Sequence, residues 1–405
     1  MRKLDIAIAG AGPAGLASAL FLHRAGHRVT VFERFDAPKP LGSGLILQPT
    51  GLAVLARLGL RGKIEALGSR IERLYGADAK SGRTVLDVRY DALKDRSGRF
   101  ETGLGVHRAA LFGVLHHAVA EAGIAVETAR PVGELETGTQ ARLVFEDGTR
   151  SAAFDLVIDA TGARSRLRGH CRTPAEPRPL AYGAWWASLP WQEGFDAHAL
   201  EQRYRHASVM IGVLPIGRMA PALEEGGGEP MAAFFWSLKP DLAETVKARG
   251  LAAWKDEVRG HWPAAAAHLD NIGSFDELTL ARYGHHTLTL PAGNGIAFIG
   301  DSAHSTSPQL GQGANMALLD AAALVDAVEA SADVEAALAA YCRMRRWHVR
   351  IFQMASRAFT PFYQSDSRAL PFLRDTLVAT VARVPPGPRL LAKLVSGTLV
   401  TPARR

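Results

Sequence analysis

Apolar and polar residues at the start of this chain follow a pattern that predicts a strand, a helix and a second strand. Residues 4–9 form a short apolar run, which is typical of a buried parallel strand. A glycine-rich turn follows, and residues 14–25 are rich in Ala and Leu, which favours a helix. Gly26 can end that helix, and residues 28–33 form a second β-type run. The order predicts a βαβ unit whose glycine turn lies at the carboxyl end of the first strand.

The rest of the chain continues this alternation. Runs that predict strands occupy residues 74–90 (two runs around a turn), 125–128, 141–145, 154–159, 210–215 and 295–300. Stretches that predict helices occupy residues 52–60, 108–121 and 243–259, and a further helix begins at 313. Between about 178 and 279 Trp and Phe cluster in β-type runs, and the glycines of 224–229 indicate a hairpin turn or a mobile loop. The expected class is α/β, with a Rossmann-like domain interleaved with a β-sheet-rich domain and followed by C-terminal helices.

Composition agrees with a large globular protein. Apolar residues make up 47% and charged residues 21% of the 405 residues. The net charge of +7 is spread out without a basic block, which argues against a nucleic-acid-binding arm. It fits either anionic partners, such as dinucleotides or carboxylated substrates, or a solvated surface. Cys171 and Cys342 have no metal-ligand or redox spacing, so reduced thiols and a cytoplasmic location are expected and no metal is predicted.

The glycine turn of the βαβ unit indicates a dinucleotide site. Gly10 permits a tight turn, Gly12 lets a pyrophosphate approach the backbone, and Gly15 lets helix and strand pack closely. The phosphates would meet the positive end of a helix that begins near Ala14. Glu33 follows about 20 residues on, where an acid binds a ribose hydroxyl. This acid favours FAD or NAD over NADP, and a ligand-free structural turn is the alternative interpretation.

Two further motifs follow, one in the middle of the chain and one late in it. Residues 159–166 read Asp-Ala-Thr-Gly-Ala-Arg-Ser-Arg after an apolar strand, and residues 300–304 read Gly-Asp-Ser-Ala-His after another. The second is followed by Ser-Pro-Gln-Leu-Gly-Gln-Gly-Ala-Asn-Met-Ala at residues 307–317. Together with the first glycine motif, their order and spacing resemble the FAD-dependent aromatic monooxygenases of the para-hydroxybenzoate hydroxylase type, over about residues 4–346.

The resemblance implies a set of FAD contacts. In the first half of the chain these are Gly10, Gly12, Ala14, Gly15, Glu33, Arg34, Gly44, Arg108 and Asp159. In the second half they are Asp301, Pro308, Gly311, Gly313, Ala314 and Asn315. Asp301 is expected at the ribityl chain and Pro308 near the reacting carbon. A helix start near Gly313, with Asn315, suits the negative edge of a reduced flavin. Arg108 either lies along the FAD or forms a surface salt bridge, and His304 is expected to be structural.

The resemblance also divides the chain. It implies a discontinuous FAD-binding domain at 1–75, 100–178 and 280–345, a substrate domain at 76–99 and 179–279, and a C-terminal helical region at 346–405. The halogenases that share this nucleotide fold carry a Trp-x-Trp-x-Ile-Pro signature, which residues 185–191 do not match.

The implied reaction is hydroxylation of a small aromatic or heteroaromatic substrate with O2. NADH or NADPH, bound transiently, reduces FAD, which then forms a C4a-hydroperoxide that hydroxylates an electron-rich ring. Tyr182, Tyr204 and His206 are candidates for deprotonating a phenol, but each also suits a pocket wall or the core, so no catalytic residue is assigned. The oligomeric state is left open.

Two alternatives remain open at this point. One is an FAD-dependent reductase or dehydrogenase acting on a quinone or lipid. The tail from Leu370 alternates apolar residues with basic ones and could lie on a membrane, although a packed C-terminal helix is the commoner explanation. The other is a flavin-loaded protein that sequesters an aromatic compound without turnover.

Overall fold

The predicted βαβ unit is present at the start of the chain. In the computed structural model, which describes residues 2–37, 42–218, 228–378, 382 and 384–400, it comprises β1 (Asp5–Ala9), α1 (Pro13–Arg24) and β2 (Arg28–Phe32). β1 and β2 pair in parallel from Asp5↔Arg28 to Ala9↔Phe32. The glycine turn therefore lies at the carboxyl end of β1, as the sequence predicts.

A six-stranded sheet is built around this unit. Its strand order is β19 (Ala292–Gly293), β20 (Ile296–Phe298), β11 (Leu156–Asp159), β1, β2 and β8 (Ala125–Glu127). β1, β11 and β20 are parallel neighbours, with Ala9 opposite Asp159 and Asp159 opposite Phe298. The three motifs of the sequence follow these three strands, so they meet at one edge of the sheet.

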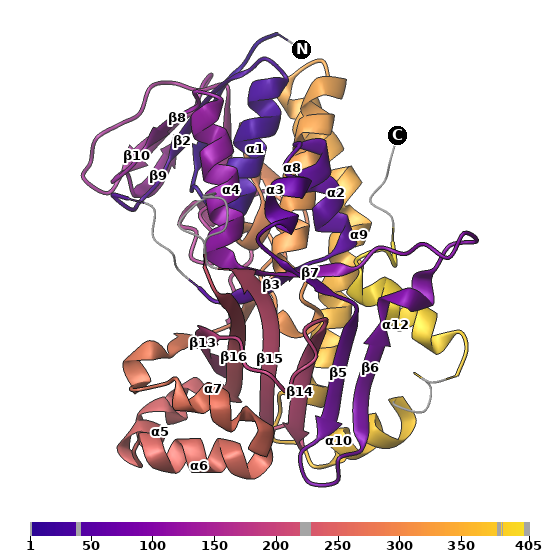
Figure 1. Cartoon of the computed structure of the whole chain (residues 1–405). Helices are drawn as coiled ribbons and strands as arrows, with labels where there is room; N and C mark the ends of the chain where they lie inside the picture. The colour runs from indigo at the N-terminus through magenta and orange to yellow at the C-terminus, as the bar shows by residue number, and fades with distance from the viewer. Residues whose placement is uncertain (1, 38–41, 219–227, 379–381, 383, 401–405) are drawn as a thin grey trace.

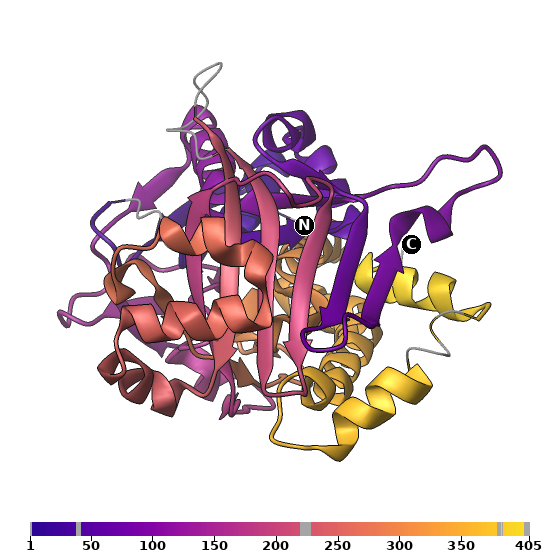
Figure 2. The same ribbon diagram turned by 60° about the horizontal axis from the view of Figure 1, so that its bottom comes forward.

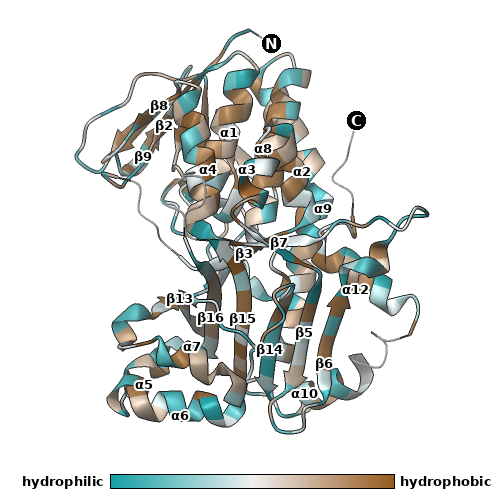
Figure 3. Ribbon diagram, viewed as in Figure 1, coloured by the Kyte–Doolittle hydropathy of each residue, from teal (hydrophilic) through white to brown (hydrophobic). Residues whose placement is uncertain are grey.

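Helices pack together above this sheet. They are α1, α2 (Pro49–Arg57), α3 (Arg61–Glu65), α4 (Arg108–Glu121) and α8 (Gly313–Ala330). Leu16 and Leu20 of α1 and Leu318 and Leu324 of α8 are buried in one core cluster. Figure 3 shows apolar residues along α1, α2 and α8 where these helices lie side by side. The α2 helix begins three residues before the predicted start, at a proline that favours the first turn.

A second, seven-stranded sheet lies below the first in Figure 1. Its order is β17 (Thr279–Ala281), β13 (Gly183–Pro190), β16 (Pro230–Leu238), β15 (Val209–Arg218), β14 (Ala199–Arg205), β5 (Arg73–Asp78) and β6 (Thr84–Arg89). Successive side chains along a strand of this sheet point to its opposite faces. Trp185 packs in a cluster under α5 (Ala243–Ala248), α6 (Leu251–His261) and α7 (Ala266–Asp270), whereas Trp186 contacts the clusters on the other face.

Smaller sheets complete the core of the fold. A three-stranded sheet lies between the two large sheets (Figure 1). Its strand order is β3 (Gly44–Leu47), β7 (Gly103–His107) and β4 (Ser69–Ile71). Two-stranded sheets pair β9 (Val132–Glu136) with β10 (Arg142–Phe145) and β12 (Arg178–Pro179) with β18 (Gly284–His285).

The C-terminal part is helical, as expected. It comprises α9 (Val334–Tyr363), α10 (Ala369–Leu373) and α12 (Gly387–Val395). Figure 2 shows these orange and yellow helices on the side of the seven-stranded sheet opposite to α5, α6 and α7. Among the described residues, no helix combines the length and the apolar character that crossing a membrane requires.

One predicted element was wrong. The single helix expected over residues 243–259 is two helices, α5 and α6, because Gly250 adopts a φ of 92° that interrupts the helical hydrogen bonding. The segment 224–229, predicted to be a hairpin turn or a mobile loop, lies mostly outside the described residues. The domain division stays a prediction, and β5 crosses its proposed boundary at residue 75.

Candidate cofactor and substrate site

The three sequence motifs lie against one another. A methyl group at Gly10, where φ is 102°, would lie 2.6 Å from the carbonyl oxygen of Ala160 in the second motif. A methyl group at Gly300 of the third motif would lie 3.3 Å from Cβ of both Ala14 and Ala317. Glycine is therefore required at position 10 both by its backbone conformation and by the close approach of the neighbouring loop.

These motifs border a cavity of about 1100 Å³. At one end it is lined by the glycine turn and the end of β2, and at the other by the seven-stranded sheet and the C-terminal helices. Twelve of the predicted FAD contacts lie on its lining: Gly10, Gly12, Ala14, Glu33, Arg34, Gly44, Arg108, Asp301, Pro308, Gly311, Gly313 and Ala314.

The end near β1 is suited to phosphates and a ribose. The N-cap residue of α1, Gly12, forms no side-chain cap, and the first turn carries no acidic residue. Its N–H groups and partial positive charge therefore face the cavity. The Glu33 carboxylate accepts hydrogen bonds from the backbone N–H of Ala11 (2.8 Å) and of Phe35 (3.1 Å), which hold it at the cavity wall. The Arg34 guanidinium lies 4.6 Å from the centre of the Phe35 ring.

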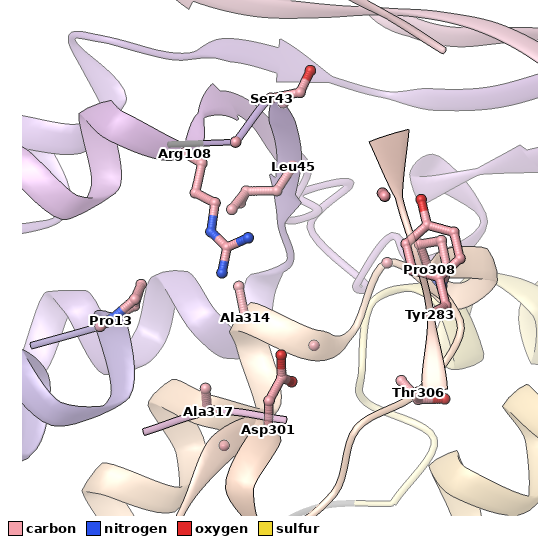
Figure 4. A pocket seen from close by; sticks show the side chains of 18 of the residues that line it. Pro13, Ser43, Leu45, Arg108, Tyr283, Asp301, Thr306, Pro308, Ala314 and Ala317 are labelled. Carbon is pink, nitrogen blue, oxygen red and sulfur yellow. The ribbon is translucent and has the colours of Figure 1, made fainter. Parts of the chain in front are cut away.

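Two charged side chains project into the middle of the cavity. Figure 4 shows the Arg108 side chain, from the start of α4, extending toward Ala314, with the Asp301 carboxylate pointing toward the same region. Arg108 is exposed and forms no ion pair with a described carboxylate, so the salt bridge considered as its alternative role is not seen. Asp301 is also exposed, and its carboxylate accepts no hydrogen bond from a described residue.

A second helix N-terminus lies on the far side of this region. The short 3-10 helix Pro308–Leu310 ends at Gly311, whose φ of 60° favours glycine, and α8 begins two residues later. Gly313, Ala314 and Ala317 line the cavity, and α8 has neither a side-chain cap nor an acidic first turn. Two uncapped helix N-termini, those of α1 and α8, thus face one cavity, which favours an extended anionic ligand.

Three of the predicted contacts lie off the cavity lining. A methyl group at Gly15 would lie 2.0 Å from the Gly10 carbonyl oxygen, so this glycine serves the packing of α1 on its own turn. Asp159 is buried, and its side chain accepts hydrogen bonds from Ser165 and from the N–H (2.9 Å) and hydroxyl (2.6 Å) of Thr161. The fully buried Asn315 is described next. Contact of all three with FAD stays a prediction.

The Asn315 side chain joins α8 to β3 and to the segment that follows it. Its Oδ1 accepts a hydrogen bond from the Gln48 N–H (2.8 Å), and its Nδ2 donates to the carbonyl oxygens of Ile46 (3.1 Å) and Gly311 (2.9 Å). A side chain at Gly51 would collide with Asn315 Oδ1 at 2.2 Å. Asn315 therefore fixes the start of α8 against two walls of the cavity.

A buried ionic network, which the sequence does not reveal, holds the Asp301 turn. Asp320 of α8 accepts hydrogen bonds from the Gly300 N–H (2.8 Å), His304 Nε2 (2.6 Å) and Arg345 Nε (2.6 Å). Burial acts to raise the pKa of Asp320, but the charges of His304 and Arg345 outweigh it and lower the pKa to about 2. His304 is structural, as expected, and Asp320 and Arg345 are separated from it by too much chain for a local motif to show.

The other end of the cavity is largely aromatic and apolar. It is lined by residues of the seven-stranded sheet, of the adjacent segments and of the C-terminal helices: Leu86, Val88, Trp186, Leu200, Gln202, Tyr204, Met210, Leu214, Phe235, Tyr283, Phe359, Tyr363, Leu391, Leu394 and Val395. Among described residues, the charged side chains of this part of the lining are Asp87 and Arg282. Asp87 is bound to Arg73, and the Arg282 side chain is 59% exposed, 3.7 Å from Asp241.

A hydrogen-bonded pair, Trp186 and Tyr283, places a polar group on the lining of the aromatic end. The Trp186 Nε1–H donates to the Tyr283 hydroxyl over 2.8 Å. Burial raises the pKa of Tyr283 to about 12, although the bond from Trp186 acts in the opposite direction. Tyr283 therefore keeps its proton at neutral pH, and it lines the same cavity as Pro308. Its hydroxyl remains free to donate to a ligand.

None of the three candidate bases is placed for that role. The Tyr182 hydroxyl donates to Asp366 (2.8 Å), and neither Tyr182 nor His206 lines the cavity. Tyr204 does line it, but its hydroxyl donates to Gln202 Oε1 (2.9 Å), and burial raises its pKa well above the usual range. Among the described residues no group of His, Cys, Asp and Glu is arranged to bind a metal ion.

The residues around the cavity fit FAD. A methyl group at Gly12 would have no protein atom within 4 Å, so space lies open beside the N-terminus of α1. Glu33, Asp301 and the N-terminus of α8 line the same cavity. A dinucleotide that carries a diphosphate, a polyol chain and a ring with a negative edge matches this set of groups.

Comparison with known proteins gives the same assignment. Residues 3–353 match the model of the FAD binding domain family. The chain is 32% identical over 338 residues to 3-amino-4-hydroxybenzoate 2-monooxygenase from Streptomyces cremeus, covering 81% of this chain and 79% of that protein. It is 28% identical to 6-hydroxynicotinate 3-monooxygenase from Bordetella bronchiseptica, covering 80% and 82%.

Solved structures share the fold over nearly the whole chain. Klebsiella pneumoniae HpxO, complexed with FAD and uric acid, superposes with a TM-score of 0.80 at 21% identity and covers 98% of this chain and 97% of its own. A tetrameric form of 2-methyl-3-hydroxypyridine-5-carboxylic acid oxygenase gives a TM-score of 0.78 at 18% identity, covering 97% of both chains. The family model, the sequence relatives and the cavity agree: the chain belongs to the FAD-dependent aromatic monooxygenases of the para-hydroxybenzoate hydroxylase type, and neither the reductase nor the sequestering protein describes it.

Proposed function

We propose that this monooxygenase hydroxylates an aromatic or heteroaromatic ring that carries no carboxylate, with NADH or NADPH as a transient reductant and O2 as the co-substrate. The observation that carries this proposal is the aromatic end of the cavity. Its described charged groups are Asp87, which is engaged by Arg73, and Arg282, which is mostly exposed beside Asp241. A ring carboxylate would lose its hydration there without gaining a buried cation, which is costly.

The relatives provide the contrast. Two of them are named for substrates that bear a carboxylate, 3-amino-4-hydroxybenzoate and 6-hydroxynicotinate. The Tyr283 hydroxyl, held by Trp186, is the polar group that we assign to orienting the ring, through a hydrogen bond to a hydroxyl, carbonyl or ring nitrogen.

The predicted FAD contacts would act as follows. The N-terminus of α1 with Gly12 would bind the diphosphate, Glu33 the adenosine ribose and Asp301 the ribityl chain. The N–H groups of Gly313 and Ala314 would face the ring edge that carries negative charge, and Arg108 would neutralise charge beside them.

Bound FAD supplies hydride acceptance and oxygen activation. The chain's own residues bind and orient the substrate and exclude water: Trp186, Phe235, Phe359 and Tyr363 enclose the aromatic end so that activated oxygen reaches the ring rather than solvent. The sequence has one GxGxxG motif, near its start, which supports transient binding of the nicotinamide. The cytoplasmic location stays a prediction.

The proposed substrate class is tested with matched ring pairs. Phenols and hydroxypyridines are compared with their carboxylated counterparts for stimulation of NAD(P)H oxidation and for incorporation of one atom from ¹⁸O2 into the product. We expect the uncharged member of each pair to give the larger stimulation and the hydroxylated product. A consistent preference for the carboxylated member would contradict the proposal.

The site assignment has its own test. Asp301→Ala should weaken FAD binding by roughly 1.5–3 kcal/mol, the value of a hydrogen bond to a charged group, which is about ten-fold or more in Kd. Asp333→Ala, at the exposed start of α9, is a matched control for loss of a carboxylate away from the cavity. Equal FAD affinity of Asp301→Ala and the parent would show that Asp301 does not contact the cofactor.

A further inference from the structure

The positive charge of this protein is concentrated at its C-terminal end. Residues 336–405 contain twelve Lys and Arg but only two acidic residues, Asp366 and Asp375, a net +10 that exceeds the +7 of the whole chain. The preceding 335 residues are therefore slightly acidic. Arg345 and Arg374 are buried, but other arginines of this part are exposed. Exposed positive charge confined to one part of a molecule is a feature that recognises an anionic partner.

Exposed apolar residues are concentrated in the same part. Of the nine large apolar side chains that are exposed among the described residues, two, Leu242 and Leu290, lie elsewhere. The other seven belong to the C-terminal helices and their connections: Trp347, Met354, Phe372, Leu373, Val384, Leu390 and Leu399. Phe372, on α10, is 70% exposed.

One face of α9 combines both features. Trp347 is 57% exposed and Met354, two helical turns on, is 54% exposed. Arg343 and Arg350 lie four residues before and three residues after Trp347, which places them on the same face. The guanidinium groups of Arg346 and Arg350 lie 5.5 and 5.6 Å from the centre of the Trp347 ring.

The arginines of this face form no ion pair with a described carboxylate. Arg343, Arg346, Arg350 and Arg357 are exposed, and no described carboxylate lies within 4 Å of them. The α9 helix contains no acidic residue after Glu335. We call this the α9 basic face: Arg343, Arg346, Trp347, Arg350, Met354 and Arg357.

The composition of this face selects its partner. A second copy of the chain would bring unpaired arginines against arginines across a two-fold axis, because such an interface joins the same patch on both subunits. An acidic protein would satisfy the charges but gives no reason for the tryptophan and methionine between them. An anionic lipid surface satisfies both, since Arg binds the headgroups while Trp and Met enter the interfacial layer.

We propose that the α9 basic face binds the surface of membranes that contain anionic lipids. The inference is independent of the substrate proposed above. It does place the substrate cavity near the lipid, because Phe359 and Tyr363 on the opposite side of α9 line that cavity. The protein would lie on the membrane without crossing it.

The test uses the FAD-loaded full chain and vesicle flotation. Vesicles of phosphatidylcholine alone are compared with vesicles that contain about one third phosphatidylglycerol, at 0.1 and 0.5 M NaCl. We expect binding to the anionic vesicles that weakens at high salt. Arg346→Glu/Arg350→Glu should reduce binding at least about twenty-fold, since each basic residue near such a surface contributes roughly five-fold. Trp347→Ser should weaken binding at both salt concentrations.

Matched controls lie on the other side of the seven-stranded sheet. Lys247→Glu/Arg249→Glu makes the same change in net charge on α5 and at its end, and Leu242→Ser removes an exposed apolar residue there. Both should bind vesicles like the parent. FAD content and thermal midpoint show that every variant is folded, and its NAD(P)H oxidation without vesicles should equal that of the parent.

Several results would overturn the proposal. They are absence of binding to anionic vesicles, equal binding to both vesicle types, and equal loss of binding in the α5 control. A dimer that Trp347→Ser dissociates, without vesicle binding, would assign the face to a second copy instead. If vesicles do not bind but an acidic protein binds the parent chain and not Arg346→Glu/Arg350→Glu, the α9 basic face would be assigned to an acidic protein partner.

Discussion

The indole Nε1–H of Trp186 donates a hydrogen bond to the hydroxyl oxygen of Tyr283 over 2.8 Å. The bond joins β13 to the segment between β17 and β18, and it occupies the acceptor side of the Tyr283 hydroxyl while leaving its proton directed to a ligand. Because this hydroxyl and Pro308 line the same cavity, we expect the hydroxyl to fix which carbon of a bound ring faces the reactive end of the cofactor.

Tyr283→Phe should weaken binding of a matching substrate by about 0.5–1.5 kcal/mol, or about two- to ten-fold in Kd, by removing one hydrogen bond. The fraction of consumed NAD(P)H that yields hydroxylated product should also fall, because the ring is less well oriented. Product and peroxide are measured together. Tyr182→Phe, which changes a tyrosine away from the cavity, should leave that fraction unchanged. Unaltered binding and coupling in Tyr283→Phe would show that the hydroxyl does not contact the substrate.

Gly12→Ala should separate folding from cofactor binding. The added methyl group meets no protein atom within 4 Å, so we expect a thermal midpoint for the apoprotein close to that of the parent. The same methyl group would occupy space at the N-terminus of α1 where the diphosphate is expected, so FAD retention should fall at least ten-fold. Fluorescence of released flavin and a melting curve measure the two quantities. Gly26→Ala provides a comparison at another position where no protein atom lies within 4 Å, although its φ of 89° adds strain.

Loss of the Asp320 charge should destabilise the fold. Asp320→Asn leaves the fully buried Arg345 without its carboxylate, and breaking such a pair costs about 3–5 kcal/mol. Asp326→Asn, at an exposed pair with Arg57, should cost less than about 1 kcal/mol. Urea unfolding measures both, and a similar small loss in the two variants would contradict the role given to the network.

The contribution of the Asp320 carboxylate to the free energy of unfolding should depend on pH under acidic conditions. Its pKa is about 2 in the folded chain against an ordinary value of 3.8. Its stabilising effect is therefore fully present above pH 4 and is lost as the pH falls from about 4 to about 2, by about 2 kcal/mol in all. The free energies of unfolding of the parent and of Asp320→Asn should therefore become more similar as the pH falls from about 4 to about 2.

His268 should add a second pH dependence, at milder acidity. It is fully buried among Trp191, Phe195 and other apolar residues, and burial lowers its pKa from 6.5 to about 4. The unfolded chain takes up a proton at this histidine below pH 6.5 but the folded chain does not until about pH 4. The free energy of unfolding should therefore fall by up to about 1.4 kcal/mol per pH unit over that interval.

His268→Leu should remove this part of the slope, whereas His117→Gln, at an exposed position, should retain it. Unfolding curves at pH 7, 6 and 5 provide the comparison. An unchanged slope in His268→Leu would show that this histidine is not buried uncharged.

The sequence predicted the cofactor end of the molecule well because its signals are local. The strand at 4–9, the glycine turn and the helix from residue 14 correspond to β1 and α1, and the start of a helix at Gly313 agrees with α8. Strand, turn and helix N-terminus are each encoded within about ten residues. The parallel order of strands then brings their carboxyl ends to one edge.

What the sequence could not show depends on contacts between distant residues. Asp159 and Asn315 belong to recognisable motifs, yet their side chains bind the protein's own loops, which only the packing reveals. The partners Asp320 and Arg345 are 25 residues apart on two helices, and Trp186 and Tyr283 are 97 apart. The break of the 243–259 helix at Gly250 is local, but glycine alone does not distinguish an interruption from a tolerated helical position.

The opposite orientation of Trp185 and Trp186 has a consequence for how this enzyme can be diversified. Along β13, β15 and β16, side chains that touch the α5–α7 layer alternate with side chains that line the cavity. Point substitutions at positions 186, 210 and 235 can therefore exchange the substrate without disturbing the helical layer, and a combinatorial library belongs at these positions. Insertion or deletion of a single residue in β13 would instead turn the side chains beyond that point to the opposite face of the sheet. Related enzymes should therefore differ in β13 by substitutions and keep the length of this strand.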